Sequence, residues 1–308
     1  MSNAVLPNTF IIGVQKAGTT TLDDWLSQHP QIYCYESLKD IHLFARFKTR
    51  EEIEQRLKKE PALYKNQPVI LQSAVNYIFY PQLLAGIAQF NQKAKLILIL
   101  RNPVDRALSS YAYFKKMLRE TRPIEEALLY QPGQITEFTK DNSDFTYIEH
   151  GFYAKQIKSC FEYFSKDQLL ILDYDDLVKN ASSLLQKIFS FLNIDASFQP
   201  DLRAKNITGS LRNQFLQERI IKRGQVRKWV VDNLVDPFFP VAKRKKLKRK
   251  LFEINTGKVK KMQSLQETDK QTIEQIRKQL ESYFCEDAKE LDAMLGTRFS
   301  EKWFGDGV

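Results

Sequence analysis

Five short apolar segments alternate with amphipathic stretches along the first half of the chain, and this alternation restricts the possible folds more than any other feature. The segments are FIIGV (10–14), QIYCY (31–35), VILQSA (69–74), KLILILR (95–101) and LLILDY (169–174). The stretches between them carry apolar residues at helical spacing. Apolar strands separated by helices are typical of a parallel sheet that helices cover on both faces. We therefore predict a three-layer α/β fold with a central parallel sheet of about five strands.

The chain beyond Asp175 has a different pattern. The segments SSLLQKIFSFLN, SLRNQFLQERIIK and KQTIEQIRKQLESYFCEDAKELDAML all have the spacing of amphipathic helices. No internal repeat and no Gly/Ser-rich linker separates them from the first half. We expect a single domain over residues 1–308, with a helical carboxyl-terminal half.

The segment TFIIGVQKAGTTTLDDW (9–25) has the outline of a phosphate-binding loop, because an apolar strand is followed by a glycine-framed turn and then by hydroxyl residues that open a helix. Ligands of open parallel sheets bind beyond the carboxyl ends of the strands. Gly18 allows the backbone to approach an oxyanion, and the amides from Gly18 to Thr21 are expected to be unpaired donors. The structural alternative is an ordinary turn with a threonine N-cap. We expect an anion site formed by Lys16, Ala17, Gly18, Thr19, Thr20 and Thr21.

The place of the lysine separates this loop from that of the nucleotide triphosphatases. In the pattern G-x-x-x-x-G-K-[ST] the lysine follows the second glycine, and the next hydroxyl holds magnesium. Here Thr19 follows Gly18, the lysine is Lys16 inside the loop, and the most apolar strand ends in Arg101. A lone lysine suits a group with less charge than a γ-phosphate. A sulfuryl group on a 5′-phosphate is such a group, and Lys16 could stabilise the oxygen that leaves.

FIIGVQKAGTTTL resembles the 5′-phosphosulfate loop of the sulfotransferases that use 3′-phosphoadenosine 5′-phosphosulfate (PAPS). The resemblance covers nearly the whole chain, since residues 151–180 and 283–304 are similar to the segment around a later core strand and to the carboxyl-terminal ending of the family. It is closest to the branch that contains heparan-sulfate-type Golgi enzymes and their bacterial relatives. It implies a P-loop-like fold, PAPS as co-substrate and no metal. The segment ITGSLRNQFL (207–216) is similar to the loop that closes over the nucleotide, which implies a cofactor contact from Arg212.

A second anion site is predicted in LILILRNPVDRALSSY. Arg101 ends a strand, Pro103 is suited to open the next helix, and Ser109 follows a little over two turns later. The guanidinium and the hydroxyl could face one phosphate, which arginine binds in a bidentate manner. The alternative is that Arg101 pairs with Asp105. In the family that the chain resembles, the arginine and serine of this motif hold the 3′-phosphate, which implies that role for Arg101 and Ser109.

Transfer to a hydroxyl also needs a base that accepts the acceptor's proton. The segment LKDIHLFARF (38–47) resembles the Lys-Glu-Pro-His-Phe-Phe pattern of this branch, whose glutamate is the base. The matching residue is Asp40, which is one methylene shorter, and Ile41 replaces the proline. His42 matches the histidine and is the alternative base. The structural alternative is a surface pair between Lys39 and Asp40 beside a buried His42.

Weaker signals mark the acceptor side. Ser73 and Tyr77 lie where the family often has Ser-Pro-x-Tyr, although Ala74 replaces the proline and Gln72 stands where some relatives carry lysine. Further candidates for the acceptor cleft are Glu149, His150 and Tyr153 in YIEHGFYAKQ.

The chain carries a formal charge of +10, much of it in the run KRKKLKRK at Lys243–Lys250. Such a run is usually a solvated helix face, and the alternative is a contact with an acidic acceptor or an anionic membrane surface. The chain has 43% hydrophobic residues, and the apolar run at 96–100 is far shorter than the roughly 20 residues of a membrane span. No secretory leader precedes the first strand, and Cys34, Cys160 and Cys285 are too scattered to indicate a disulfide framework or a zinc site. We expect a cytoplasmic protein.

These features favour a PAPS-dependent sulfotransferase that sulfates a hydroxyl, or less readily an amine, of a carbohydrate, lipid or small metabolite. An acidic glycan or a lipid would suit the basic charge. The first alternative is a magnesium-dependent nucleotide kinase or NTPase with an atypical loop, against which the missing Gly-Lys-[ST] counts. The second is a non-enzymatic module that binds nucleic acid or polyanionic glycan through Lys243–Lys250. No recognisable nucleic-acid module accompanies that run, so we expect no nucleic-acid partner.

Overall fold

The computed structural model describes residues 4–35, 38–47, 49–58, 64–129, 139, 144–203 and 270–305. The predicted helix over SLRNQFLQERIIK, the predicted cofactor contact Arg212 and the basic run Lys243–Lys250 lie outside these residues. None of the helices in the described ranges is both long enough and apolar enough to cross a membrane.

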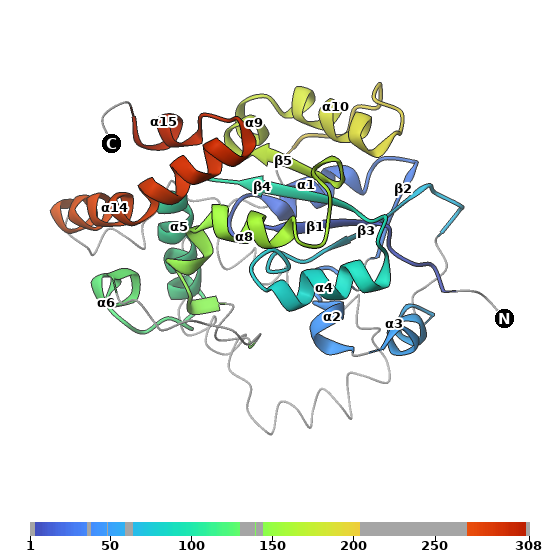
Figure 1. Ribbon diagram of the computed structural model, residues 1–308, viewed down its shortest axis with the longest axis horizontal. Helices are drawn as coiled ribbons and strands as arrows, with labels where there is room; N and C mark the ends of the chain where they lie inside the picture. The colour runs from blue at the N-terminus through green and yellow to red at the C-terminus, as the bar shows by residue number, and fades with distance from the viewer. Residues whose placement is uncertain are drawn as a thin grey trace.

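A five-stranded parallel sheet forms the centre of the fold, as predicted. Its strands lie in the order β2-β3-β1-β4-β5 (Figure 1). Their bounds are β1 Thr9–Gly13, β2 Ile32–Cys34, β3 Val69–Ser73, β4 Lys95–Leu100 and β5 Leu169–Asp173. All five strands fall inside the apolar segments of the sequence or within one residue of them. Because β1 lies between β3 and β4, the loop that follows β1 is flanked by the carboxyl ends of both neighbours.

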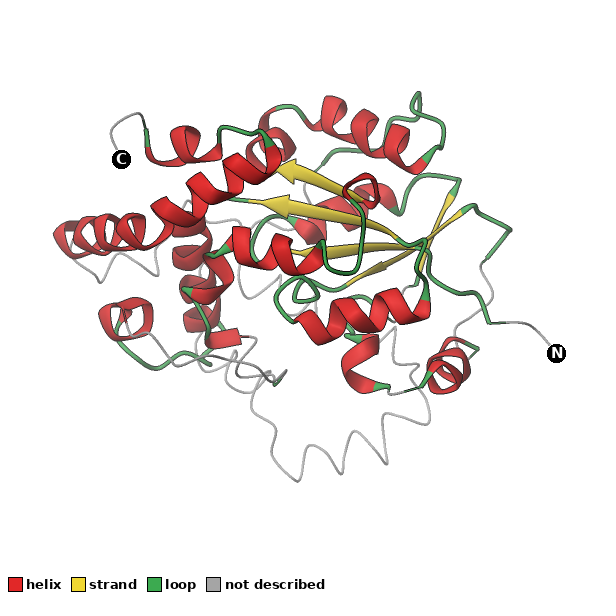
Figure 2. Cartoon of the chain, in the orientation of Figure 1, coloured by secondary structure: helices red, strands yellow, loops and turns green. Residues whose placement is uncertain are grey.

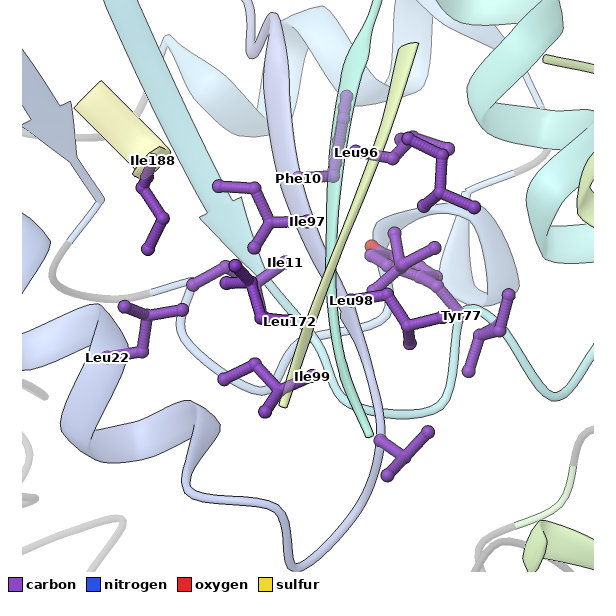
Figure 3. Close-up of a cluster of buried hydrophobic side chains, with 14 of the residues drawn as sticks. Phe10, Ile11, Leu22, Tyr77, Leu96, Ile97, Leu98, Ile99, Leu172 and Ile188 are labelled. Atoms are coloured by element: carbon purple, nitrogen blue, oxygen red, sulfur yellow. The ribbon is translucent and has the colours of Figure 1, made fainter. Parts of the chain in front are cut away.

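The strands are continuously apolar because both faces of the sheet are buried. Side chains alternate between the faces along each strand, so Ile97 and Ile99 of β4 share one face. Figure 3 shows them with Leu22 and Ile188, which come from helices in the layer on that side. On the other face Leu96 and Leu98 lie with Phe10 and Tyr77 (Figure 3). Each of these side chains is fully buried, which explains why the sequence signal for the strands is strong.

Helices cover the sheet on both sides (Figure 2). Before β5 they are α1 Thr19–Leu26, α2 Leu43–Arg46, α3 Arg50–Leu57, α4 Pro81–Phe90, α5 Pro103–Lys116, α6 Ile124–Leu129 and α8 Tyr153–Cys160, with the short 3₁₀ helices η1 Glu149–Gly151 and η2 Lys166–Gln168. After β5 they are α9 Tyr174–Lys179, α10 Ala181–Leu192, α14 Lys270–Leu295 and α15 Phe299–Phe304. Within the described ranges, the chain beyond Asp175 is therefore helical, as the sequence predicts.

Helix α5 starts where β4 delivers Arg101 to the edge of the sheet. The side chain of Asn102 accepts hydrogen bonds from the amides of Val104 and Asp105, at 2.9 and 3.2 Å, and Pro103 occupies the first helical position. This combination of an Asn cap and a Pro at the first position fixes the start of a helix. The Nδ2 of Asn102 also donates to the carbonyl of Trp303 at 3.1 Å, which ties the start of α5 to α15.

Helix α14 packs beside α5 and α8 (Figure 1). Asp287 of α14 accepts a hydrogen bond from the amide of Ala154 at 3.1 Å, so its carboxylate caps the start of α8. Burial raises the pKa of Asp287 to about 6, although hydrogen bonds from α8 amides oppose the shift. Arg277 of α14 forms an ion pair of 2.7 Å with Asp105 of α5. The carboxyl-terminal segment therefore helps to fix the two helices that stand closest to the edge of β4.

Gly151 is the point where close packing of α14 can be tested. A Cβ at position 151 would lie 2.5 Å from Phe284 Cε1 and 3.1 Å from Pro103 Cβ. We expect Gly151→Ala to lower the free energy of unfolding by about 1–3 kcal/mol, as overpacking does, when measured by urea denaturation. Phe284→Leu supplies the matched background, because it removes the ring that meets the new methyl group. The double variant should lose at least ~0.5 kcal/mol less than the sum of the single losses. Strict additivity would contradict this packing.

Candidate active site

The loop between β1 and α1 is shaped by two residues in the left-handed backbone region. Lys16 has φ 70° and Gly18 has φ 80°. A Cβ at Gly18 would lie 3.3 Å from both Tyr174 and Leu177, so the glycine serves the backbone conformation and also leaves room for α9. The loop therefore turns sharply beyond the carboxyl end of β1, at the place where the sequence predicts an anion site.

The amides of the loop are arranged differently from the expectation. Gly18 is the N-cap of α1, and none of the threonine side chains caps the helix. The amide of Thr21 donates to the carbonyl of Gly18 at 2.9 Å, so the expectation that this amide is unpaired is wrong. The amides of Thr19 and Thr20 precede the first intrahelical donors, and a helix leaves such groups available to a ligand. Thr19 and Ala17 are buried, Gly18 and Thr21 are half-buried, and Thr20 is exposed.

Lys16 carries its ammonium group into a crowded and positively charged place. Its Nζ lies 4.0 Å from the centroid of the Tyr113 ring. Burial, together with the smaller effects of the charges of Arg101, Lys116 and Arg106, lowers the pKa of Lys16 to about 8. No ion pair connects Lys16 to a carboxylate of the described residues. The lysine is therefore protonated in most molecules at neutral pH and available to an anion.

Arg101 lies directly against the same loop. Its Nη1 donates to the carbonyl of Lys16 at 2.9 Å, and its guanidinium lies 4.6 Å from the centroid of the Tyr174 ring. The hydroxyl of Tyr153 donates to the carbonyl of Arg101 at 2.8 Å and fixes the backbone there. The expected alternative, a pair with Asp105, is not what the structure has, since Asp105 pairs with Arg277. The Nε of Arg101 is buried with no hydrogen-bond partner among the described residues.

Two adjacent serines of α5 have different surroundings. Ser110 is fully buried and donates to Oε1 of Gln15 in the loop at 2.8 Å. Ser109, the predicted phosphate ligand, is half-buried. Ser110 therefore connects α5 to the loop. Ser109 lies in the same helix, which begins two residues after Arg101.

Three further residues of α5 belong to the site and were not predicted from the sequence. They are Arg106, Tyr113 and Lys116, which with the serines repeat at intervals of three or four residues and so lie along one face of the helix. Arg106 is fully buried, one of its amino groups donates to the carbonyl of Tyr147, and its Nε and Nη1 have no partner among the described residues. Burial lowers the pKa of Arg106 to about 10 and that of Lys116 to about 8. Their helical spacing from Ser109 was the available signal.

Asp40 stands at the edge of β3, on the opposite side of the loop from Arg101. Its amide donates to the carbonyl of Ser73 at 2.9 Å, its φ is 60°, and its side chain is exposed. Gln72 holds the turn from inside, because its Nε2 donates to the carbonyl of Ile41 at 2.9 Å. Lys39 pairs with Asp23 of α1, which also accepts a hydrogen bond from Ser73, so the expected alternative of a Lys39–Asp40 pair is wrong.

His42 has a more enclosed environment than Asp40. Its ring lies 5.6 Å from the ring of Tyr77, centroid to centroid, at the start of α2. Burial, together with the smaller effect of the Arg46 charge, lowers the pKa of His42 to about 4. Tyr77 is fully buried and its hydroxyl accepts a hydrogen bond from the amide of Leu43 at 3.0 Å. These two residues therefore support the turn that carries Asp40.

The remaining acceptor-side candidates lie around η1. His150 is buried and stacks on Phe79 with a centroid distance of 3.8 Å, and Tyr153 is buried beneath Arg101. Glu149 is half-buried, and burial raises the pKa of its carboxyl group. His150 and Tyr153 thus act in packing and in fixing the edge of β4, and Glu149 stays a candidate for the acceptor cleft.

The donor set of this edge fits an anionic nucleotide. Lys16 lies in the loop and Arg101 donates to its carbonyl, and neither forms an ion pair with a carboxylate of the described residues. The buried Nε of Arg101 has no hydrogen-bond partner among those residues. Across the described ranges, no group of three or more His, Cys, Asp or Glu side chains could hold a metal ion. The acidic residue at the end of β5, Asp173, accepts a hydrogen bond from the amide of Asp175 and pairs with Lys302.

Comparison with known proteins decides the family. The model of the sulfotransferase domain matches residues 6–266. The chain belongs to the sulfotransferase domain family. The resemblance read from the sequence is confirmed, and so is the predicted fold.

Relatives in this family share part of their length with the chain. Heparan sulfate glucosamine 3-O-sulfotransferase 5 of Mus musculus is 29% identical over 193 residues, which are 61% of this chain and 54% of that protein. Carbohydrate sulfotransferase 15 of Mus musculus is 26% identical over 247 residues, covering 61% of this chain and 44% of that protein. The chain therefore spans about half the length of the curated relatives it matches. The crystal structure of a sulfotransferase from Alicyclobacillus acidocaldarius has the same fold, with a TM-score of 0.56, 24% identity and coverage of 72% of this chain and 98% of that one.

The two serines of α5 should respond differently to the same substitution. We expect Ser110→Ala to lower the free energy of unfolding by about 1 kcal/mol, because a buried hydrogen bond to Gln15 is lost. Ser109→Ala should leave stability unchanged and weaken binding of 3′-phosphoadenosine 5′-phosphate about tenfold, because a hydrogen bond to a charged group is lost. Urea denaturation and calorimetric titration without metal measure the two effects. Equal affinities of the two variants would remove Ser109 from the site.

Proposed function

We propose that this chain transfers a sulfuryl group from PAPS to a hydroxyl of an acceptor and releases 3′-phosphoadenosine 5′-phosphate. The observation that carries the proposal is the contact between Arg101 and the backbone of Lys16, which joins two predicted anion sites at one loop. Neither cation has a carboxylate partner in the described part of the chain. The family match supports transfer of a sulfuryl group over transfer of a phosphoryl group.

The chain's own residues supply binding and orientation. The amides of Thr19 and Thr20 would receive the 5′-phosphosulfate, since the start of a helix favours negative charge. Arg101 and Ser109 would hold the 3′-phosphate, and the Tyr174 ring keeps the guanidinium in place. Because the nucleotide would be held at both ends, its sulfuryl group would have a fixed orientation toward the acceptor. Fixed orientation of the reacting groups supplies a large part of the rate enhancement in group-transfer enzymes.

PAPS supplies an activated sulfur bound to a phosphate that can leave. During transfer the acceptor oxygen forms a bond to sulfur, the bond between sulfur and the bridging phosphate oxygen breaks, and the acceptor loses its proton. Asp40 would take that proton, and Lys16 would donate a hydrogen bond or a proton to the leaving oxygen. The sheet order supports this division, since Lys16 follows β1 and Asp40 is bonded to the end of the neighbouring β3.

Asp40 is the better candidate for the base. Its side chain is exposed, whereas the His42 ring is enclosed beside Tyr77. Taking up a proton would place a positive charge on a buried imidazole, which its lowered pKa shows to be unfavourable. An exposed carboxylate that takes up a proton loses charge and bears no such cost.

The acceptor proposed here is a hydroxyl of a carbohydrate. The names of two relatives support this class, since they are a heparan sulfate glucosamine 3-O-sulfotransferase and a carbohydrate sulfotransferase. Sulfation of an amine, of a lipid or of a small metabolite is the alternative outcome of an acceptor screen. Contact of Lys243–Lys250 with an anionic surface, the contact of Arg212 and a cytoplasmic location stay predictions.

Lys16 is the first residue to test. We expect Lys16→Ala to lower kcat for PAPS-dependent sulfation about 10²- to 10³-fold, because a donor to the leaving oxygen is removed. Arg101→Ala should chiefly raise the KM for PAPS. In the wild type, kcat/KM for PAPS should fall above about pH 8, because the protonated form of Lys16 is lost there. Lys115→Ala is the matched control, since among the described residues the Lys115 ammonium contacts the carbonyls of Thr121 and Arg122 and the ring of Tyr111. Normal turnover by Lys16→Ala would contradict the assignment.

Asp40 and His42 are separated by a second pair of variants. Asp40→Asn keeps the size of the side chain and should lower kcat about 10²- to 10⁴-fold, the usual contribution of a general base. His42→Gln should retain kcat within a few-fold, and its effect should appear in thermal stability. Transfer of ³⁵S from labelled PAPS to a panel of oligosaccharides measures both variants. The reverse order of the two losses would make His42 the base.

A further inference from the structure

Tyr113 lies at this edge of the sheet but belongs to neither of the two predicted anion sites. It lies on α5 one helical turn beyond Ser109, and its side chain is half-buried. The ammonium of Lys16 lies 4.0 Å from its ring centroid, which is well inside the range of a cation–π contact. We propose that Tyr113 is a positioning residue, whose ring face holds the Lys16 ammonium at the edge where the leaving oxygen is expelled. This inference rests on the proposed sulfuryl transfer.

The surroundings of Lys16 explain why an aromatic ring is suited to this task. The charged groups that face Lys16 are Arg101, Arg106 and Lys116, all of the same sign. A buried cation among cations needs a partner, and a carboxylate would provide one at the cost of repelling the anionic donor. The negative face of a ring attracts the ammonium without carrying a formal charge. The charge of the Lys16 ammonium is therefore not neutralised by its partner and can act on the phosphate oxygen.

Tyr113 also lies on the side of the base. Burial raises the pKa of the Tyr113 hydroxyl, the charges of Asp40 and Asp144 raise it further, and the charge of Arg119 opposes the shift. These three, with Lys16, are the charged groups that face Tyr113. One side chain thus contacts the donor to the leaving oxygen and lies within the electrostatic reach of the proposed base.

The test varies the ring face at constant shape. Position 113 is replaced by phenylalanine and then by 3,5-difluoro- and 3,4,5-trifluorophenylalanine, which withdraw electron density from the ring face step by step. A weaker attraction disfavours the charged ammonium, so the pKa of Lys16 should fall along the series by about half a unit in total. The alkaline limb of the kcat/KM profile for PAPS should move to lower pH by the same amount. At pH 9 this corresponds to about threefold lower kcat/KM in the trifluoro variant than in Tyr113→Phe.

A second measurement does not depend on turnover. In protein labelled with ¹³C at lysine Cε, the Lys16 resonance is the one that disappears in Lys16→Arg. The Tyr113 ring current displaces the chemical shift of this resonance. The change of that shift with pH gives the pKa of Lys16 directly. The same fluorinated residues at position 111 are the control, because the Tyr111 ring faces Lys115 and its hydroxyl bonds the carbonyl of Arg122. Those variants should leave the Lys16 resonance and its titration unchanged.

The outcomes separate this inference from the proposed function. A pKa of Lys16 that is constant across the fluorinated series would overturn the role of Tyr113, whatever the activity of the wild type. A graded pKa in a protein that transfers no sulfate from PAPS would support the contact and overturn the proposed function. A graded pKa with a matching shift of the kcat/KM limb supports both.

Discussion

The site is built around a concentration of positive charge that the fold must hold together against its own repulsion. Lys16 and Arg101 come from two different loops, and Arg106 comes from α5. In addition to burial, the charges of Arg101 and Arg106 lower the pKa of Lys16, and the charge of Arg101 lowers the pKa of Arg106. The structure stabilises these cations with neutral groups, namely the carbonyls of Lys16 and Tyr147 and the faces of aromatic rings. Neutral partners satisfy the donors and leave the net charge in place, so the same contacts that stabilise the cations also keep the edge attractive to an anion.

The order of the strands places different kinds of residues on the two sides of the loop after β1. With β1 in the centre, the loop that carries Lys16 has the end of β4 on one side and the end of β3 on the other. Cationic groups gather on the β4 side, while on the β3 side Asp23 fixes Lys39 and Ser73 and presents the turn of Asp40. A nucleotide held on one side would meet an acceptor that enters from the other. The separation of the proposed acid, Lys16, from the proposed base, Asp40, would therefore be a property of the sheet and not of any single loop.

The strands were predictable because both faces of the sheet are buried, so each strand is an uninterrupted apolar run in the sequence. The positions of Gly18, Lys16 and Arg101 at the edge of the sheet were predictable because a glycine-framed turn and a strand-ending arginine are local patterns. Tyr113 and Tyr174 were not, because their rings reach the loop only through the packing of α5 and α9, and a tyrosine in an amphipathic helix gives no local sign of such a contact. A threonine N-cap was the structural alternative for this turn, and Gly18 is the N-cap instead because its left-handed backbone already directs the chain into the helix.

The segment from 270 to 305 has a bearing on how the molecule is made. Asp287 caps α8, the carbonyl of Trp303 receives the Asn102 side chain, and Lys302 neutralises the end of β5. Two of these contacts reach the carboxyl ends of β4 and β5 and the third reaches the start of α8, all of which are translated long before this segment. A chain on the ribosome that has completed its five strands therefore still lacks these contacts, and this edge of the sheet is complete only after α14 and α15 have been made and have docked. Synthesis that stops short of this segment would release a protein with an intact sheet and an unfinished site.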